Sequence, residues 1–554
     1  MQKTTNYCTR NILFTILGII IISIIILSLV PPTTKDELVH HLAVPKLYLE
    51  HGGIYEIPFM EYAYYPMNLD LLYMIPLYFG NDIAPKFIHF TFALLTAWLI
   101  FYYLKSRTNT QYALFGAVFF LSVPIIVKLS ITAYIDLGEI FFSFAALILV
   151  IEWMKRDFKL KYLIWSGIMC GLALGTKYNG LVTLAILTLF VPFIYSRYQD
   201  KKRPGFVKPM YYGIIFVFVS LLVFSPWMIR NYNWKGNPIY PLYNNVFNPP
   251  KEVKKAVSEQ TDTIKKNRGF FTTRALLYKE TGLEIALLPV RIFFQGKDGE
   301  AKYFDGKLNP FLLLLTLFAF YGLRHEPIYL KREKKVLLVF SILFFSFAFF
   351  SSGLRIRYIA PFIPPLVILS VFGLENLFKL IQRISSLIAK RICITLIILI
   401  PCCALFLNGN YIAGLYKSVD PISYITGKVS RDGYIEKYIP EYPALGYINS
   451  NLDDQARILF IYTGKRGYYC DRDYLIDNSM GIMKGFISKA EGPEDISAGL
   501  KKRGITHLLV GYVSFDEWMN NNFSEEKQEI TQTFFKEHME FLYGENGFGV
   551  SAIK

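Results

Sequence analysis

Cysteine is scarce in this sequence, and the pattern of the few cysteines indicates neither disulfides nor a metal site. There are six cysteines in 554 residues, and all except Cys470 lie in or beside apolar runs. None of them has metal-ligand spacing, and no His-Glu-x-x-His motif is present. The sequence therefore does not indicate a disulfide framework or a metalloenzyme of that kind.

A clustered basic surface is also lacking. The 59 lysines and arginines exceed the 43 acidic residues and give a net charge of +16. They fall in short loops between apolar runs and do not gather on one amphipathic face, so nucleic acid is not indicated as a partner. The excess of lysine and arginine in these loops is instead typical of a chain that crosses a membrane several times.

Apolar residues dominate the composition, at 53%, with 17% aromatic. A hydrocarbon core about 30 Å thick needs about 20 apolar residues per helix. Runs of that kind predict a polytopic α-helical membrane protein with about 11 spans. The predicted spans lie near residues 12–30, 84–104, 111–128, 135–154, 161–178, 179–196, 209–228, 308–323, 335–352, 358–378 and 391–409.

The charges between these runs predict an orientation. With a cytoplasmic N-terminus, the basic loops near 105–107, 155–161, 197–208, 324–335 and 379–391 all fall inside, as the positive-inside bias requires. The first run has no small-residue cleavage site before Pro31-Pro32, which favours an uncleaved signal anchor. We therefore expect a multi-pass protein of the plasma (inner) membrane with an extracytoplasmic C-terminus.

Three regions then face the outside: residues 31–83, 229–307 and 410–554. The tail, 410–554, predicts a small α/β domain, with strands in "ARILFIYTG", "THLLVGYV" and "GFGVSAIK" and helices in "EDISAGLKKRG" and "SEEKQEITQTFFKEHMEFLYG". The predicted domains are therefore a membrane domain, 1–409, and an extracytoplasmic domain, 410–554.

The segment directly after the first span combines acids and histidines. Thr34 to Glu37 fits a capping box, in which Glu37 reaches back to the Thr34 backbone. Because neighbouring residues of a helix point about 100° apart, we assign Asp36 to chemistry and Glu37 to the cap. Alternatively, both acids only favour the positive end of a helix dipole.

Several motifs in a fixed order carry a family resemblance. After the acidic pair come "YYPMNLDLLYMIP", "AYIDLGEIFFSF", "GLALGTKYNG", "SPWMIRNYNWKGNPIYP" and "GLRIRYIAPFIPPLVIL". Over about residues 10 to 409 the chain resembles the GT-C membrane glycosyltransferases, in particular the bacterial branch with protein mannosyltransferases and aminoarabinose transferases. The resemblance implies a polyprenyl-phosphate-linked sugar donor and an acid in the first outer loop that activates the acceptor. Asp36 is the matching position.

Further candidates are charges at the outer ends of spans. Asp136 and Glu139 share a helix face, and intramembrane acids tend to face a polar cavity. The resemblance raises Asp136 above Glu139, while a structural pair with Lys128 is the alternative. Lys177 suits a lipid phosphate as a point charge, although it could also snorkel to the interface.

Arginines and histidines complete the set of candidates. Arg355 and Arg357 reach the outer boundary, where an arginine fork binds either a donor phosphate or a lipid headgroup, and the resemblance favours Arg357. Arg230 is a weaker phosphate candidate. His40 and His41 could bind a divalent metal with Asp36 or Asp136, but the sequence requires no cofactor.

The resulting hypothesis is sugar transfer to an acceptor at the outer face of the membrane. Asp36 acts as general base, Lys177 and Arg357 stabilise the leaving phosphate, and the acceptor is a glycan, a lipid or a protein. A transporter or flippase for a lipid-linked glycan is the alternative, against which no inverted repeat stands out. A membrane scaffold would explain the tail but not the ordered charges in the spans.

Overall fold

The computed structural model describes residues 2–199, 205–249, 270–349, 354–477 and 480–554. The chain divides into two compact units. One comprises Met1–Ser28, Tyr65–Leu72 and Lys86–Pro421, and we call it the helical unit. The other comprises Leu29–Tyr64, Tyr73–Pro85 and Ile422–Lys554, and we call it the mixed unit. Most of the predicted first outer loop thus groups with the C-terminal tail.

The helical unit consists of apolar helices joined mostly by short turns. Its helices are α1 (Gln2–Ser28), α4 (Ala84–Lys105), α5 (Thr110–Ser122), α6 (Pro124–Ser130), α7 (Asp136–Lys155), α8 (Leu160–Thr176), α9 (Gly180–Tyr198), α10 (Val207–Lys235), α11 (Asn244–Phe247), α13 (Phe270–Tyr278), α14 (Gly282–Ala286), α15 (Leu288–Phe294), α16 (Phe311–Phe318), α17 (Ile328–Phe349), α18 (Ile356–Ile359), α19 (Ile363–Ile381) and α20 (Leu387–Val419). The helix α3 (Asn68–Tyr78) begins in this unit and ends in the other.

The multi-span helical membrane fold is as predicted, but the count of eleven spans is not confirmed. Within the described ranges, seven helices are long and apolar enough to cross a membrane, or eight if the bent pair α5–α6 forms one span. Two of the predicted runs form shorter helices, since α8 has 17 residues and α16 has only eight. Length and composition therefore support fewer full crossings than the hydropathy of the sequence suggests.

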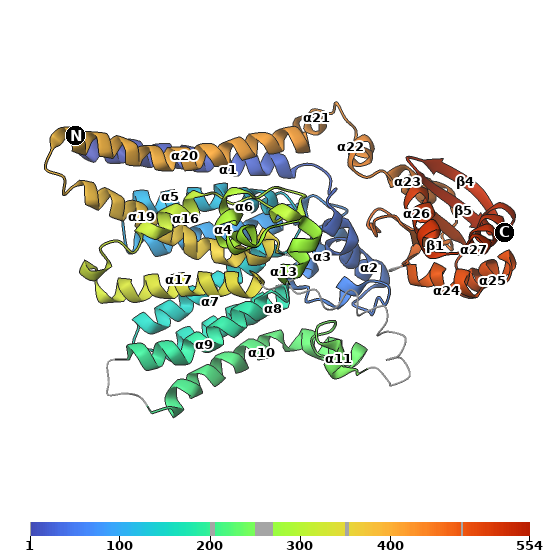
Figure 1. Ribbon diagram of the computed structural model, residues 1–554, viewed down its shortest axis with the longest axis horizontal. Helices are drawn as coiled ribbons and strands as arrows, with labels where there is room; N and C mark the ends of the chain where they lie inside the picture. The colour runs from blue at the N-terminus through green and yellow to red at the C-terminus, as the bar shows by residue number, and fades with distance from the viewer. Residues whose placement is uncertain (1, 200–204, 250–269, 350–353, 478–479) are drawn as a thin grey trace. The chain divides into compact units, whose positions relative to one another are not determined.

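The helices differ in how much of their surface is buried inside the protein. Most of α7 and of the Ile356–Ile381 segment is buried inside the protein, whereas most of α20 is exposed. Figure 1 shows α20 running alongside α1. The exposed apolar faces of α1 and α20 suit lipid, and the central position of α7 places its N-terminal acids within the protein.

The mixed unit contains a five-stranded sheet. The strands are β1 (Arg457–Ile461), β2 (Asp473–Ile476), β3 (His507–Gly511), β4 (Met539–Glu545) and β5 (Phe548–Ile553), in the order β2-β1-β3-β5-β4. The strand β1 pairs in parallel with β2 and β3, while β5 pairs antiparallel with β3 and β4. Its helices are α2 (Ala43–His51), α21 (Pro421–Ile425), α22 (Arg431–Tyr438), α23 (Tyr442–Asn451), α24 (Gly481–Lys489), α25 (Pro493–Lys502), α26 (Tyr512–Asn522) and α27 (Glu525–Glu537).

The predicted α/β character of the tail is confirmed, with two corrections. The predicted helix 524–544 ends at Glu537, and the rest of it forms β4. Glu545 pairs with Phe548 across Asn546-Gly547, and both turn residues have positive φ. Asn-Gly between two strands is a strong hairpin signal, so the sequence did carry this information. The four-residue strand β2 was also missed.

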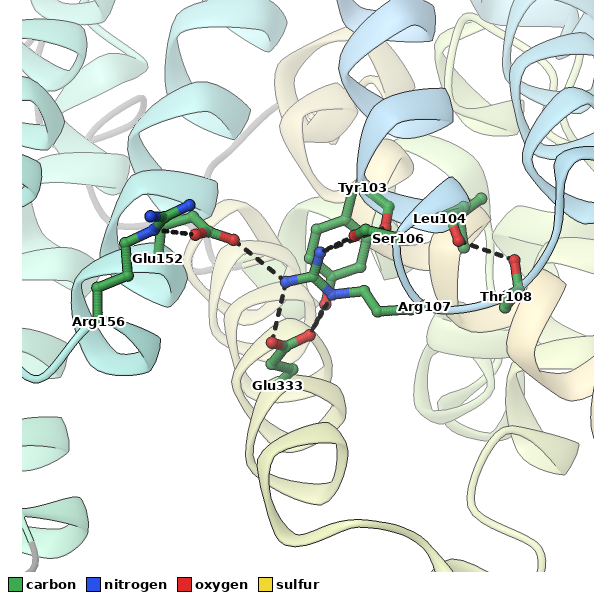
Figure 2. Close-up of polar contacts among 8 residues, drawn as sticks. All are labelled: Tyr103, Leu104, Ser106, Arg107, Thr108, Glu152, Arg156 and Glu333. Carbon is green, nitrogen blue, oxygen red and sulfur yellow. Dashed lines mark hydrogen bonds and ion pairs between the residues drawn. The ribbon is translucent and has the colours of Figure 1, made fainter.

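A buried ion-pair network joins three helices at the end of α7 far from Asp136. Figure 2 shows Arg107, two residues beyond α4, between Glu333 of α17 and Glu152 of α7. Arg107 donates to both oxygens of Glu333, Nε to Oε2 at 2.6 Å and Nη2 to Oε1 at 2.9 Å, and Nη2 lies 3.3 Å from Glu152. The Tyr103 hydroxyl also donates to Glu333 at 2.6 Å. Such a fork fixes both distance and orientation between the helices.

We expect Glu333→Gln to destabilise the fold strongly. The Arg107 side chain is only 3% exposed, so the substitution leaves a buried guanidinium without its main counter-charge, at a cost of about 3 to 5 kcal/mol. Thermal unfolding of the purified protein in detergent measures this. Glu375→Gln, which removes the partner of the more exposed Lys379, is the control and should cost less than about 1 kcal/mol. Equal losses in the two variants would contradict the assignment.

Candidate functional site

An ion pair between Asp136 and Lys177 is the centre of the candidate site in the helical unit. Asp136 is the first residue of α7 and is 1% exposed, while Lys177 directly follows α8. The Nζ atom of Lys177 lies 2.5 Å from Oδ1 of Asp136. The alternative partner Lys128 instead lies 2.9 Å from Asp298 and 3.3 Å from Asp305. Lys177 is thus engaged by a buried carboxylate within the protein.

His89 of α4 fixes the start of α7. The backbone N–H of Leu137 donates to Nε2 of His89 at 2.8 Å, and Nδ1 of His89 lies 2.8 Å from the carbonyl oxygen of Thr132. Because a carbonyl can only accept, Nδ1 carries the hydrogen and the imidazole is neutral. His89 is fully buried, and it satisfies one of the free N–H groups of the first helical turn. The sequence reasoning missed it, since a histidine within an apolar run carries no distinctive signal.

Tyr358 connects Lys177 with Arg357. The Nζ atom of Lys177 lies 5.1 Å from the centroid of the Tyr358 ring, and Cζ of Arg357 lies 5.2 Å from the same centroid. Arg357 also lies 5.3 Å from the ring of Tyr134, two residues before Asp136. The two residues predicted to bind the donor phosphate, far apart in sequence, are therefore brought together beside Asp136.

Arg355 and Glu139 lie near this cluster but have different surroundings. Arg355 is more exposed and forms an ion pair with Asp305 at 3.6 Å. Glu139 is completely buried one turn after Asp136, and neither of its carboxyl oxygens has a hydrogen-bond partner among the described residues. An unsatisfied buried carboxyl is costly and marks a position that bound water or a ligand could complete.

Arg230 is held in a separate aromatic cluster. Its guanidinium lies 4.4 Å from the Trp227 ring and 4.9 Å from the Trp234 ring. It donates to the Asn231 side chain and, at 3.1 Å, to the carbonyl of Tyr65. These contacts give Arg230 a structural role in packing this segment, apart from the cluster of Lys177 and Arg357.

Two glycines bring the start of α3 close to the site helices. A Cβ at Gly138 of α7 would lie 2.5 Å from Leu69, and a Cβ at Gly175 of α8 would lie 2.3 Å from Asn68. Asn68 in turn accepts a hydrogen bond from the indole N–H of Trp227 at 2.8 Å. The absence of side chains at these glycines thus allows Asn68 and Leu69 to pack directly against α8 and α7.

In the mixed unit, Glu37 contacts Thr34 as predicted, but the helix that begins there is a π-helical turn and not an α-helix. Oε2 of Glu37 accepts from the Thr34 backbone N–H at 3.0 Å and from the Thr34 hydroxyl at 2.7 Å. The hydroxyl therefore donates to Glu37 and does not cap a backbone group. Residues Glu37–His41 form a π-helical turn, where Leu42 N–H bonds to the Glu37 carbonyl. Glu37 is fully buried, whereas Asp36 is partly exposed.

The histidines next to Asp36 pack against aromatic rings. His40 stacks on Tyr62 with ring centroids 4.6 Å apart, and its ring lies 3.9 Å from that of His41. In the described ranges, no group of three or more His, Cys, Asp or Glu side chains is placed to hold a metal ion. The hypothesis of a metal bound by these histidines therefore gains no support from their geometry.

The C-terminal domain holds the Asp36 segment from both sides. The Tyr469 hydroxyl donates to the Pro32 carbonyl at 2.7 Å, and the Tyr468 N–H donates to the Leu38 carbonyl at 3.2 Å. Burial raises the pKa of Tyr469 well above its usual range, so its hydroxyl stays protonated as a donor. Leu38 itself is buried against Ile435 and Ile439.

Two charged contacts extend this attachment. Lys46 of α2 donates to the carbonyls of Tyr468 and Cys470 at 3.0 and 2.8 Å and to Asp471 at 2.7 Å. Arg431 of α22 pairs with Asp82 at 2.5 Å. The tail thus contacts the predicted first outer loop before and after Asp36 and again near its end.

We expect Asp136 and Lys177 to be energetically coupled. Lys177→Gln leaves the buried Asp136 carboxylate without its ion-pair partner and should cost about 3 to 5 kcal/mol of unfolding free energy, and Asp136→Asn, which leaves the partly buried Lys177, should also destabilise the fold. The double variant should cost less than the sum of the two, by roughly 0.5 to 3 kcal/mol. Denaturant unfolding in detergent micelles measures the parental protein, both single variants and the double variant. Strictly additive costs would show that the pair does not form.

Comparison with known proteins agrees with this fold. The family model for dolichyl-phosphate-mannose-protein mannosyltransferase matches residues 75–229, which include Asp136 and Lys177 but neither Asp36 nor Arg357. No curated protein matches the chain significantly by sequence.

Solved structures match over nearly the whole chain. The crystal structure of ArnT from Cupriavidus metallidurans bound to undecaprenyl phosphate covers 97% of both chains with 12% identity and a TM-score of 0.54. The Archaeoglobus fulgidus oligosaccharyltransferase tethered with an acceptor peptide matches 98% of this chain and 74% of its own, with 12% identity and a TM-score of 0.52. The archaeal oligosaccharyltransferase AglB in complex with an inhibitory peptide and a dolichol-phosphate covers the same shares, with a TM-score of 0.50. The chain therefore has the GT-C fold of membrane glycosyltransferases, of the type seen in ArnT, as its sequence motifs predicted.

Proposed function

We propose that the protein transfers a sugar from a polyprenyl-phosphate-linked donor to an acceptor hydroxyl or amine at the outer face of the plasma membrane. The observation that carries the proposal is the convergence of Lys177 and Arg357 on Tyr358, beside Asp136. Two cations at the end of membrane helices suit a phosphate that is attached to a lipid chain. Undecaprenyl phosphate in ArnT and dolichol-phosphate in AglB support the same donor class.

The reaction is a direct displacement. The Asp36 carboxylate takes the proton of the acceptor hydroxyl or amine, and the acceptor atom forms a bond to the anomeric carbon of the sugar. The bond between that carbon and the phosphate oxygen breaks, and its electron pair leaves with the polyprenyl phosphate. Lys177 and Arg357 stabilise the charge that develops on the phosphate.

The contacts around Asp36 support its role as base. A general base contributes about 10² to 10⁴-fold when it is held in position. Tyr468 and Tyr469 bond to the backbone on either side of Asp36, while the Asp36 side chain is partly exposed. Glu37 is buried in its contacts with Thr34, which suits a structural role.

Removing either proposed donor-phosphate residue should reduce transfer. We expect Lys177→Ala and Arg357→Ala each to lower the rate by about 10² to 10³ because a preorganised charge is lost. The measurement is sugar transfer from a defined polyprenyl-phosphate sugar in detergent, without vesicles. Lys128→Ala is the matched control, since this cation pairs with Asp298 and Asp305 and should leave the rate near the parental value.

Parental rates in both Lys177→Ala and Arg357→Ala would refute the phosphate assignment. A complete lack of transfer by the parental protein in detergent, together with movement of the lipid-linked sugar across vesicles, would instead favour the flippase alternative.

The neighbouring acids should respond differently to loss of charge. Asp36→Asn keeps the shape of the side chain but removes the basic carboxylate, so single-turnover transfer should fall by about 10² to 10⁴-fold while donor binding survives. Glu37→Gln should keep much of the activity, because the amide oxygen can still accept from Thr34. An active Asp36→Asn beside an inactive Glu37→Gln would exchange the two roles, and two active variants would remove the base from this segment.

A further inference from the structure

A polar cavity lies at the end of α7 opposite to Asp136. The helix has 20 residues, so its two ends are about 30 Å apart, which is the thickness of a hydrocarbon core. The cavity has a volume of about 470 Å³ and is bordered by the ends of α7 and α9 and the starts of α10 and α17. It is therefore remote from the Asp136–Lys177 pair and plays no part in the proposed transfer.

The charges that line this cavity are mainly positive. The lining includes the cations Lys155, Lys208 and Arg332 and the carboxylates of Asp157 and Glu333. Glu333 is fully buried, and its charge is already compensated by the bidentate contact with Arg107 (Figure 2). Among the described residues that line the cavity, cations therefore outnumber carboxylates, which favours an anionic ligand.

Aromatic rings contact two of these cations, Arg332 and Lys208. Cζ of Arg332 lies 4.8 Å from the ring of Tyr198, and Nη1 of Arg332 donates to the Tyr198 carbonyl at 3.3 Å. The Nζ atom of Lys208 lies 5.8 Å from the ring of Tyr195. Tyrosines with an apolar body and a polar tip are typical of the membrane–water boundary. The cavity therefore lies at the level of lipid headgroups, and Arg332 and Lys208 are held there by their tyrosine contacts.

The turn that forms one wall has an unusual backbone. Asp157 and Phe158 follow one another with φ of 52° and 58°, a left-handed conformation that ordinary side chains rarely adopt. The Phe158 ring packs against Trp153 and Tyr195, with centroids 4.8 Å away in each case. This packing compensates for the backbone cost and keeps the wall in a fixed shape.

We infer that this cavity binds the phosphate headgroup of an anionic membrane lipid in the leaflet opposite to the candidate transfer site. Basic pockets between transmembrane helices are suited to such headgroups, and a cation near the surface contributes to anionic lipid binding. The cavity lies where α7 and α9 end and α10 begins, so a bound lipid would keep its acyl chains along the apolar helices. A lipid there would strengthen the same helix junction that Arg107 and Glu333 join.

The test compares lipid retention by the full-length protein in native mass spectrometry from mixed micelles of phosphatidylglycerol and phosphatidylcholine. We expect the parental protein to retain phosphatidylglycerol preferentially. The variant Lys155→Gln/Lys208→Gln should lose about fivefold of that preference for each removed charge. Both lysines are exposed, so the variant should fold, as its melting temperature would verify.

A matched variant, Lys161→Gln/Arg197→Gln, removes the same charge from the same end of the helices. Both residues are exposed and neither lines the cavity. It should retain the parental preference, and an equal loss in this variant would overturn the site in favour of a general surface potential. Arg332→Gln provides a second variant of the lining, and a parental preference in both lining variants would also overturn the inference.

Inorganic phosphate distinguishes the lipid from a free anion. We expect phosphate at millimolar concentrations to leave phosphatidylglycerol retention unchanged, because a bound lipid also keeps its acyl contacts with the helices. Displacement of the lipid by phosphate would show that the cavity takes a soluble anion, and the lipid assignment would be wrong. None of these outcomes depends on whether the protein transfers sugar.

Discussion

The ion pair of Asp136 and Lys177 constrains how the helices around the candidate site are arranged. Two charges inside a membrane protein are tolerated only when they lie close together and their other valences are satisfied. The 2.5 Å contact requires the start of α7 and the end of α8 to meet at one level. His89 sets the first of these positions, and Gly138 and Gly175 allow residues 65–72 to pack closely beside both helices. Much of the packing near the site thus follows from one electrostatic requirement.

A second constraint acts on the Asp36 segment, where sequence neighbours are held by residues more than 400 positions away. Lys46 and Pro32 contact Tyr468, Tyr469 and Cys470 through hydrogen bonds to backbone carbonyls. Backbone contacts of this kind fix the path of a chain irrespective of the side chains between them. A π-helical turn, which is often found at functional sites, occurs in the segment that is held in this way. Hydrogen bonds from the C-terminal domain therefore fix the position of the acidic segment.

The sequence predicted those features that depend on local pattern. The long apolar runs located the long helices, short apolar runs located β1, β3 and β5, and the spacing of Thr34 and Glu37 predicted their contact. It could not predict the features that depend on tertiary distance. Whether Asp136 pairs with Lys128 or with Lys177 is decided by the relative positions of α6, α7 and α8, and both lysines are compatible with the sequence pattern. Likewise His89 acts only through contacts with Thr132 and Leu137, which lie over 40 residues away. The missed hairpin is different, because Asn546-Gly547 was visible in the sequence.

The proposed reaction increases the negative charge of the phosphate that the two cations of the candidate site would bind. Asp136 compensates Lys177 as long as no anion is bound, whereas Arg357 is held by the rings of Tyr134 and Tyr358. Under the proposed function the donor is a phosphodiester with one negative charge. Departure of the sugar converts it to a phosphomonoester with a second ionisable oxygen, so the negative charge on the phosphate increases. The same two cations would therefore attract the phosphate more strongly as the sugar departs, and this difference between donor and product is what lowers the barrier to transfer.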